Sequence, residues 1–375
     1  MPAPTLAKLS LALLLATACV AAHAENWPIP DWSAQTPSQS TAQQSALTAL
    51  ENYAFPARDD ETRKGVRTDA LLIVRDGQII YERYAGPTKA GTPHLTWSVS
   101  KSIFAAVLGV AYGQGRFKLD APVADYYPAM AAHPTIKMGH LLNWASGLDW
   151  EEDYEYAPLK SSVVAMLYTR GRGDMAAFVA SHSSDAEPGQ RFRYSSGDST
   201  MLAATLKGMT RPEEYKSYPW TALFEPLGIN SAVWETDPTG TFVGSSYAYM
   251  SARDLARVGL LMQRDGRWGE QQVLPKAWVD FSLTPFANYQ PDPEQPNDAI
   301  PGGQWWLNLA LNGAAKPWPD APADTFAALG HWGQSLYVIP SEKLIIVRYA
   351  DDRDGSYQHN QLLKLAQAAF AEVQP

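Results

Sequence analysis

Two apolar, β-branched runs near the start of the chain predict the first strands of a sheet. Residues 70–74 and 78–84 flank Arg75-Asp76-Gly77, and Asp-Gly between two such runs is a strong signal for a tight β-hairpin. Strand-like runs return only late in the chain, at residues 305–309, 336–339 and 344–349. We therefore expect one antiparallel sheet that is built from both ends of the chain.

Helical spacing of the apolar residues dominates between these strands. Residues 98–112 carry apolar side chains three and four positions apart and end near two glycines, which predicts a long, buried helix. Further helices are predicted at residues 136–144, 161–168, 174–181, 200–208, 251–264 and 361–373. The expected fold class is α/β (α+β), in which helices flank the sheet and an all-helical domain is inserted into it.

The same patterns give the expected domain boundaries. Residues 25–46 are rich in Pro, Ser, Thr and Gln, which predicts an irregular lead-in. The sheet domain is expected at residues 47–100 and 225–375, and the mainly helical domain at residues 101–224. The sequence shows no internal repeat that would indicate a solenoid or a propeller.

The first 24 residues are typical of an export signal. Lys8 precedes an apolar run at residues 9–22, and Ala22-His23-Ala24 forms a small-x-small cleavage site. The run is too short to span a bilayer, so we expect an exported protein, periplasmic or secreted, with no transmembrane segment. Cys19 is the single cysteine, and it leaves a lipid anchor as the alternative. A chain that is cleaved after Ala24 has no thiol and therefore no disulfide.

Composition and charge exclude several classes of function. The chain has 375 residues, of which 46% are hydrophobic, so it is long enough to bury a large core. Its net charge is -9 and no basic run stands out, which argues against nucleic-acid binding. The seven histidines show no metal-ligand spacing, and we expect neither a metal nor another cofactor. The G-x-S-x-G sequence of α/β-hydrolases does not occur.

Ser98-Val99-Ser100-Lys101 can supply a nucleophile and its base. At the start of a helix, residues three positions apart share a face, so the Lys101 amine can approach the Ser98 hydroxyl beside the positive end of the helix dipole. A serine hydroxyl is a poor nucleophile until a base takes its proton, and a lysine is such a base only if burial and neighbouring positive charge leave it neutral. The S-x-x-K pattern also arises by chance, so its interpretation depends on other motifs.

Two further motifs follow in order along the chain. Tyr194-Ser195-Ser196 stands about a hundred residues later, and His331-Trp332-Gly333-Gln334 lies between late strands. In these three motifs and their order, the sequence resembles the serine β-lactamase and penicillin-binding superfamily, whose patterns are S-x-x-K, Y-x-N or Y-x-S, and K-T-G or H-x-G. The resemblance covers roughly residues 50–370 and implies a β-lactamase/transpeptidase-like fold.

The resemblance implies a role for each matching residue. Ser98 is expected to be the nucleophile that accepts the acyl group, and Lys101 its base. Tyr194 is expected to carry a proton between the nucleophile and the leaving group, which suits a phenol if cationic neighbours lower its pKa. The backbone N–H groups of Ser98 and Gln334 are expected to form the oxyanion hole. Ser196 stands where many members have Asn, and its hydroxyl can still accept from Lys101 and donate to a substrate.

The third motif narrows the expected substrate. In relatives with K-T-G, the Lys and Thr are associated with a substrate carboxylate. This chain has His331, which is at most partly charged near neutrality, and Trp332, which has no hydroxyl. We therefore expect no tightly held carboxylate. The residues expected to contact substrate are Ser196, His331, Trp332, Gly333 and Tyr154.

Within the superfamily, the chain is most similar to the branch of 6-aminohexanoate-dimer hydrolases and related esterases. The likeness lies in residues 97–102, 146–154 and 333–338. Tyr154 matches a tyrosine that lies over the substrate in that branch, although an aromatic anchor at the pocket rim explains it equally well. The acidic residues of 151–155 could receive an amine-bearing substrate, but an ordinary solvated turn is favoured.

These observations predict an exported serine hydrolase that cleaves a small-molecule ester or amide through an acyl-enzyme on Ser98. A class C β-lactamase or a D-alanyl-D-alanine carboxypeptidase is the first alternative, because the same three motifs would serve it. A catalytically inactive relative that only binds wall fragments or a partner protein is the second. Such a binder has no chemical need for Ser98, Lys101 and Tyr194 together. The sequence gives no prediction of the oligomeric state.

Overall fold

The computed structural model describes residues 25–291 and 299–370. The expected export segment, with Cys19, lies outside the described residues, as do the last residues of the helix expected at 361–373. Within the described ranges, none of the helices is both long and apolar enough to cross a membrane.

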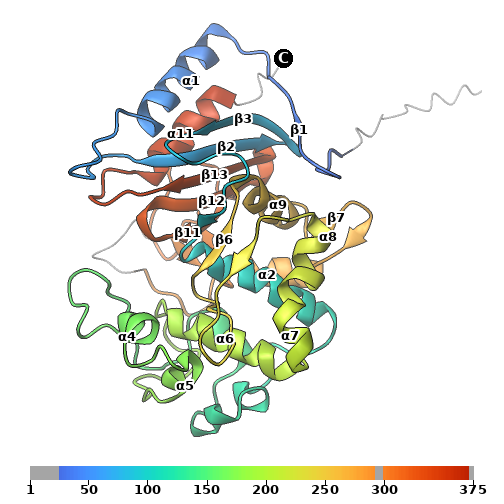
Figure 1. Cartoon of the computed structure of the whole chain (residues 1–375), viewed down its shortest axis with the longest axis vertical. Helices are drawn as coiled ribbons and strands as arrows, with labels where there is room; N and C mark the ends of the chain where they lie inside the picture. Colours follow the sequence, from blue (N-terminus) through green and yellow to red (C-terminus); the bar gives the residue numbers. More distant parts are fainter. Residues whose placement is uncertain (1–24, 292–298, 371–375) are drawn as a thin grey trace, which may run out of the picture.

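An eight-stranded sheet joins the two ends of the chain (Figure 1). The strand order is β1-β3-β2-β13-β12-β11-β10-β9, in which the early strand β2 pairs antiparallel with the last strand, β13. The predicted fold class is therefore confirmed, but β1 runs parallel to β3, so the sheet is mixed rather than purely antiparallel. The strands are β1 (Ser33–Ala34), β2 (Thr68–Arg75), β3 (Gln78–Tyr84), β9 (Ile300–Pro301), β10 (Trp306–Leu307), β11 (Phe326–Gly330), β12 (Gln334–Ile339) and β13 (Leu344–Ala350).

β2 and β3 form the hairpin that Asp-Gly predicts. Both turn residues have a positive φ, 46° at Asp76 and 75° at Gly77, as a type I′ turn requires. The sequence pattern does not predict β11, because two alanines and a glycine give its five residues little β propensity. β11 pairs antiparallel with β12, and the third sequence motif forms the short turn between them.

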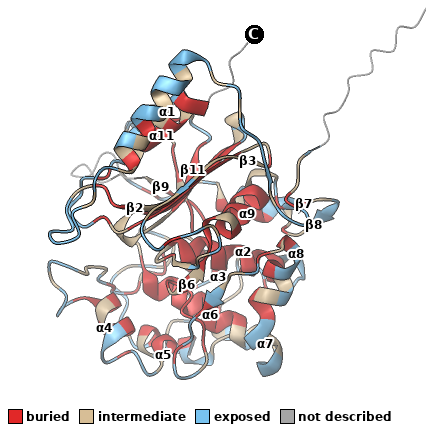
Figure 2. Ribbon diagram, turned by 45° about the horizontal axis from the view of Figure 1, so that its top comes forward, coloured by how far each residue is buried: buried red, intermediate tan, exposed pale blue. Residues whose placement is uncertain are grey.

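Helices cover both faces of the sheet (Figure 1). α1 (Thr41–Ala54) and α11 (His359–Phe370) pack against each other and against one face. α2 (Val99–Gly113) and α9 (Ala252–Gln263) pack on the other. α1 begins at Thr41, so the chain becomes regular before residue 46. Figure 2 shows that α2 is buried along most of its length, because it lies between the sheet and the helical region.

The helical region consists of short helices that begin at polar caps. Side chains of Ser161, Asp174 and Ser195 accept backbone hydrogen bonds at the starts of α4, α5 and α6. α6 starts at Ser196, four residues before the predicted position, so the second sequence motif lies at a helix N-terminus. The helices here are α3 (Met138–Leu142), α4 (Ser162–Tyr168), α5 (Met175–Ala180), α6 (Ser196–Met209), α7 (Pro212–Pro219) and α8 (Glu225–Leu227).

Smaller elements connect this region to the sheet. A three-stranded sheet has the order β4-β6-β5, and β7 pairs with β8. Their bounds, with the remaining helix, are β4 (His94–Leu95), β5 (Val233–Trp234), β6 (Ala248–Met250), β7 (Arg267–Trp268), β8 (Gln271–Gln272) and α10 (Lys276–Ser282). β4 ends two residues before Trp97 and so leads the chain directly into α2.

Candidate active site

Ser98 and Lys101 lie at the start of α2 and face each other, as their spacing predicts. Ser98 is the N-cap residue but its side chain caps no backbone group, and Lys101 Nζ lies 3.0 Å from Ser98 Oγ. Trp97 has a left-handed φ of 49°, which is uncommon for a bulky residue. Ser98 is half-buried and lines a pocket, whereas Lys101 is only 2% exposed. The hydroxyl is thus open to a ligand while the amine lies beneath it.

Three oxygen atoms surround the Lys101 amine. Nζ donates to Ser98 Oγ, Ser196 Oγ and the carbonyl oxygen of Ser245, each at 3.0 Å. Burial lowers the pKa of Lys101 to about 8, although the negative charge of Glu152 raises it. At pH 7, roughly a tenth of the amines are therefore neutral and able to take a proton. Burial alone therefore lowers the pKa of Lys101, whereas the sequence suggested that a neighbouring positive charge would also be needed.

Tyr194 reaches the same atoms from the segment before α6. Its hydroxyl shares a hydrogen bond with the Ser98 side chain, and Lys101 Nζ lies 4.8 Å from the centroid of its ring. Burial, and secondarily the charge of Glu152, raises the pKa of Tyr194 well above its ordinary value. The condition that cationic neighbours lower this pKa is therefore not met. A neutral phenol can pass on a proton, but Lys101 is the group suited to begin the reaction as the base.

Glu152 turns inward from the acidic loop and completes the buried network. Ser196 donates to it twice, from Oγ to Oε1 at 2.5 Å and from the backbone N to Oε2 at 2.9 Å, and Trp150 Nε1 also donates to Oε2 at 2.5 Å. These bonds fix the direction of the Ser196 hydroxyl, whose oxygen is thereby left to accept from Lys101. A solvated turn is therefore the wrong interpretation for Glu152, although it fits its exposed neighbour Glu151.

The third motif packs against the start of α2. A Cβ on Gly330, the last residue of β11, would lie 2.5 Å from Thr96 O and 3.2 Å from Ser98 N. Glycine therefore allows this close approach. The same Cβ would lie 3.1 Å from Gln334 Cβ, so the first residue of β12 is also a neighbour of Ser98. The two residues whose N–H groups are expected to form the oxyanion hole thus both lie close to Gly330.

His331 and Trp332 have different surroundings. His331 lines the pocket, where its Nε2 lies 3.0 Å from Glu155 Oε1. Burial lowers the pKa of His331, although the charge of Glu155 opposes this shift, so the ring carries little charge near neutrality. The Arg353 guanidinium carbon lies 3.2 Å from the centroid of the Trp332 ring, and Trp332 lines a neighbouring cavity instead.

Ser98 opens onto a pocket of about 660 Å³, a size typical of small-molecule sites. Tyr154 lines it with its ring 5.2 Å from that of His331, at the position expected for a contact with substrate. Ser196 is 0% exposed and is not part of the pocket lining, so the structure gives no support to a contact between Ser196 and substrate. The described lining contains carboxylates, aromatic rings and neutral groups but no lysine or arginine: Ser98, Glu152, Asp153, Tyr154, Glu155, Tyr156, Tyr194, Trp306, Leu329, Gly330 and His331.

Two other expected contacts with substrate find no support in this lining. Trp332 and Gly333 border the adjacent cavity, which contains Asp352 and Arg353. Neither residue lines the pocket beside Ser98. The turn that contains them connects Gly330 to Gln334, which both lie close to Ser98.

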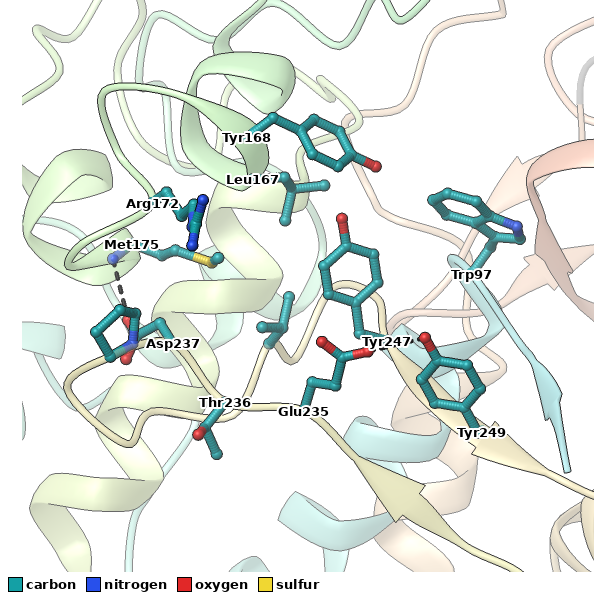
Figure 3. A pocket seen from close by; sticks show the side chains of 12 residues that line it. Trp97, Leu167, Tyr168, Arg172, Met175, Glu235, Thr236, Asp237, Tyr247 and Tyr249 are labelled. Carbon is teal, nitrogen blue, oxygen red and sulfur yellow. Dashed lines mark hydrogen bonds between the residues drawn. The ribbon is translucent and has the colours of Figure 1, made fainter.

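Trp97 lines a second pocket, of about 630 Å³ (Figure 3). Its ring meets the ring of His331 edge-on at a centroid distance of 5.5 Å and the ring of Tyr247 at 6.1 Å. In Figure 3, the rings of Tyr247 and Tyr249 lie beside Glu235 on the side near Trp97, and Arg172 lies at the other end. Both signs of charge therefore line the second pocket.

Replacing Tyr194 with Phe should lower kcat/KM for a nitrophenyl ester by about 100-fold, because proton transfer to the leaving group loses its carrier. The ring keeps its packing, so thermal unfolding should change little. Tyr218→Phe is the matched control, since its hydroxyl bonds only Gln114 Oε1 at 2.8 Å, outside the site. Steady-state kinetics of both variants tests this. Near-native rates in Tyr194→Phe would make the hydroxyl a spectator.

Glu152→Gln should shift the acid limb of the pH–rate profile to lower pH and reduce kcat/KM about tenfold. The carboxylate raises the pKa of Lys101, so its removal lowers that pKa and the neutral amine forms at lower pH. Activity falls because an amide oxygen cannot replace both carboxylate oxygens that accept from Ser196. Glu151→Gln, at the exposed neighbour, should leave the profile unchanged. An unmoved limb and a full rate in Glu152→Gln would contradict this role.

Comparisons with known proteins agree with the predicted family and fold. The family model described as Beta-lactamase matches residues 50–369. Among curated proteins, the 6-aminohexanoate-dimer hydrolase of Paenarthrobacter ureafaciens is 27% identical over 309 residues, which cover 78% of this chain and 74% of that protein.

Solved structures show the same fold. EstCE1, described as a hydrolase with promiscuous acyltransferase activity, matches with a TM-score of 0.68 and 18% identity over 88% of this chain and 100% of its own. The penicillin binding protein from Bacillus halodurans matches with a TM-score of 0.63 and 16% identity over 88% of this chain and 100% of its own. The family model matches most of this chain. The chain therefore belongs to the β-lactamase family and is a serine hydrolase of that family.

Proposed function

We propose that this protein is exported and cleaves a small ester or amide through an acyl-enzyme on Ser98. The observation that carries the proposal is the 3.0 Å contact between Ser98 Oγ and Lys101 Nζ, at the floor of an open pocket. Burial holds the pKa of this lysine near 8 rather than at its usual value. The apolar residues 9–22 and the small-residue site that ends at Ala24 support export.

Acylation begins when the neutral Lys101 amine takes the proton of Ser98. The freed Oγ attacks the substrate carbonyl carbon, and the carbonyl electron pair moves onto its oxygen. The backbone N–H groups of Ser98 and Gln334 stabilise that oxyanion. Ser196 and the carbonyl of Ser245 remain bonded to the protonated lysine and hold it in position.

Collapse of the oxyanion expels the leaving group and forms the Ser98 ester. The Tyr194 hydroxyl gives its proton to the departing alkoxide or amine and recovers one from Lys101, so that the amine is neutral again. A water molecule then enters, loses a proton to Lys101 and attacks the ester carbonyl. As the acid leaves, Lys101 gives this proton to Ser98 Oγ, which restores the neutral amine and the free hydroxyl and completes the cycle.

The charges in the pocket favour a neutral or amine-bearing substrate over one held by its carboxylate. Asp153 and Glu155 are acidic, His331 carries little charge, and the described lining includes neither lysine nor arginine. A β-lactamase or D-alanyl-D-alanine carboxypeptidase acts on substrates that have a carboxylate beside the scissile bond. The match to a 6-aminohexanoate-dimer hydrolase supports a hydrolase of other amides or esters.

Turnover of paired substrates tests the proposed function. The purified protein should hydrolyse short-chain nitrophenyl esters rapidly and nitrocefin or D-alanyl-D-alanine peptides feebly. Rapid nitrocefin turnover with feeble ester turnover would instead assign a β-lactamase. A protein that hydrolyses none of these and takes up no fluorophosphonate label would be a binding protein, and the proposal would be wrong.

Export has its own test. Expressed with its native N-terminus in a Gram-negative host, the protein should be recovered from the periplasm or the medium, with Glu25 as its first residue. Replacing Leu13 with Arg should retain it in the cytoplasm, because a charge interrupts the apolar run. Recovery of the uncleaved native chain from the cytoplasm would contradict export.

A further inference from the structure

A buried ion pair, Arg348 with Asp352, contacts the backbone of the third motif. Arg348 on β13 is 0% exposed, and it binds Asp352 with two hydrogen bonds, from Nη1 to Oδ2 at 2.5 Å and from Nη2 to Oδ1 at 3.0 Å. Its Nε donates to Thr68 Oγ1 at 2.9 Å. Its Nη1 also donates to the carbonyl oxygen of Gly333 at 3.1 Å. Every nitrogen of the guanidinium is therefore bonded, and one bond holds the backbone of the motif.

Asp352 holds the same turn from its own backbone. Its N–H donates to Trp332 O at 3.1 Å, so this pair fixes the carbonyls of both Trp332 and Gly333. The fit leaves no space for a side chain, because a Cβ on Gly333 would lie 2.1 Å from Asp352 Oδ2 and 2.5 Å from Arg348 Nη1. The φ of Gly333 is 87°, which also favours glycine.

The bond to the Gly333 carbonyl also orients the next N–H group. A peptide bond is planar, and in its trans form the C=O and N–H point in opposite directions. The Gly333–Gln334 bond is not among the cis bonds of the described chain. When Arg348 draws the Gly333 oxygen to one side, the Gln334 N–H is directed to the other side. Gln334 and Ser98 both lie close to Gly330.

A stability role explains this arrangement poorly. Removing two charges from water is costly, and apolar residues of similar volume often replace a buried ion pair with no loss of stability. An oxyanion hole, in contrast, needs donors that are fixed before charge develops, since a small displacement weakens the stabilisation. An ion pair that fixes two successive carbonyls meets this need.

We propose that Arg348 and Asp352 are positioning residues that aim the Gln334 N–H at the oxyanion formed on Ser98. The inference rests on the proposed function, because it assigns a reason for the pair only if Ser98 forms a tetrahedral intermediate. The pair touches no substrate. It acts through the backbone of Gly333, and its effect is therefore confined to the step in which negative charge develops on the carbonyl oxygen.

Arg348→Met and Arg348→Lys test the proposal with a matched ester and thionoester. Sulfur accepts hydrogen bonds weakly, so hydrolysis of the thionoester depends less on the oxyanion hole. In Arg348→Met, kcat/KM for the ester should fall about 10- to 100-fold, mostly through kcat, and the ester-to-thionoester ratio should fall about tenfold. The affinity for a boronic acid, which forms a tetrahedral adduct with Ser98, should fall in parallel. The acid limb set by Lys101 should stay in place.

Arg257→Met is the matched control. Arg257 is also buried and donates from Nη1 to two carbonyl oxygens, those of Pro28 at 2.7 Å and Leu227 at 2.8 Å, away from the site. Its variant should destabilise the fold without changing the ester-to-thionoester ratio. A folded Arg348→Met with the wild-type ratio and boronic acid affinity would overturn the proposal.

The Lys variant keeps the test decisive if Arg348→Met does not fold. A lysine keeps the charge beside Asp352 but cannot span both carboxylate oxygens and the Gly333 carbonyl. The ester-to-thionoester ratio of Arg348→Lys should therefore also fall. A wild-type ratio in this variant would overturn the proposal. Failure of the proposed function can be distinguished from failure of this proposal about Arg348 and Asp352. In that case the wild-type protein itself neither hydrolyses the ester nor is labelled at Ser98.

Discussion

Ser98→Ala should abolish ester turnover and covalent labelling by a fluorophosphonate, a loss of about 10⁴-fold or more. The Ser98 hydroxyl is the group that we propose becomes acylated. Within the described residues, the other serine side chain bonded to Lys101 is that of Ser196, which is fully buried. The fold should be unaffected, because the Ser98 side chain caps no backbone group. Labelling followed over time on both proteins, with thermal unfolding as the check on folding, gives the result.

Ser217→Ala controls for substitution of a serine as such. Its hydroxyl bonds only the local carbonyl of Glu214, at 3.4 Å on the exposed side of α7. This variant should be labelled at the wild-type rate. Equal labelling of Ser98→Ala and the wild-type protein would end the assignment of Ser98 as the nucleophile.

Lys101→Ala should reduce the rate of acylation by roughly 10³- to 10⁵-fold while the protein remains folded. Ser98 would keep its place at the start of α2 but would have no group to take its proton. The wild-type rate should rise with pH through about 8, because burial holds the pKa of Lys101 there and the neutral fraction grows above it. The residual rate of the variant should lack this limb. Stopped-flow acylation measured from pH 6 to pH 10 separates the two.

Lys101→Arg distinguishes a base from a positive charge. A guanidinium keeps the charge but does not lose its proton in this pH range, so this variant should be as inactive as Lys101→Ala. Addition of a small primary amine should restore part of the rate in Lys101→Ala only, by filling the space left by the side chain. Substantial turnover by Lys101→Arg would show that the lysine stabilises charge and is not the base.

Local rules account for the parts of the site that the sequence could predict. The pairing of Ser98 with Lys101 follows from helical spacing alone, and the hairpin follows from Asp76-Gly77. The approach of Tyr194 to Ser98 depends on contacts between distant segments, and only the resemblance to a family with three ordered motifs suggested it. The sheet from both chain ends was predictable, because apolar strand patterns occur only there. β11 was not, since alanine and glycine carry little strand signal.

Long-range packing decides what the sequence analysis missed. Glu152 lies among four acidic residues, and only the fold shows that it faces Ser196 while Glu151 faces solvent. The raised pKa of Tyr194 follows from burial, which its local sequence does not reveal. Arg348 did carry a signal, because a charge interrupts the fully buried strand β13. A charged residue within an apolar strand indicates a partner that must be buried with it.

The mass of the intact protein during turnover tests the central claim most directly. After rapid mixing with a slowly hydrolysed ester and quenching in acid, the wild-type protein should gain the mass of one acyl group, and peptide mapping should place that group on Ser98. Lys101→Ala should show no such gain on the same timescale. Product formation without a mass increase, or an acyl group on a different residue, would contradict a mechanism through Ser98.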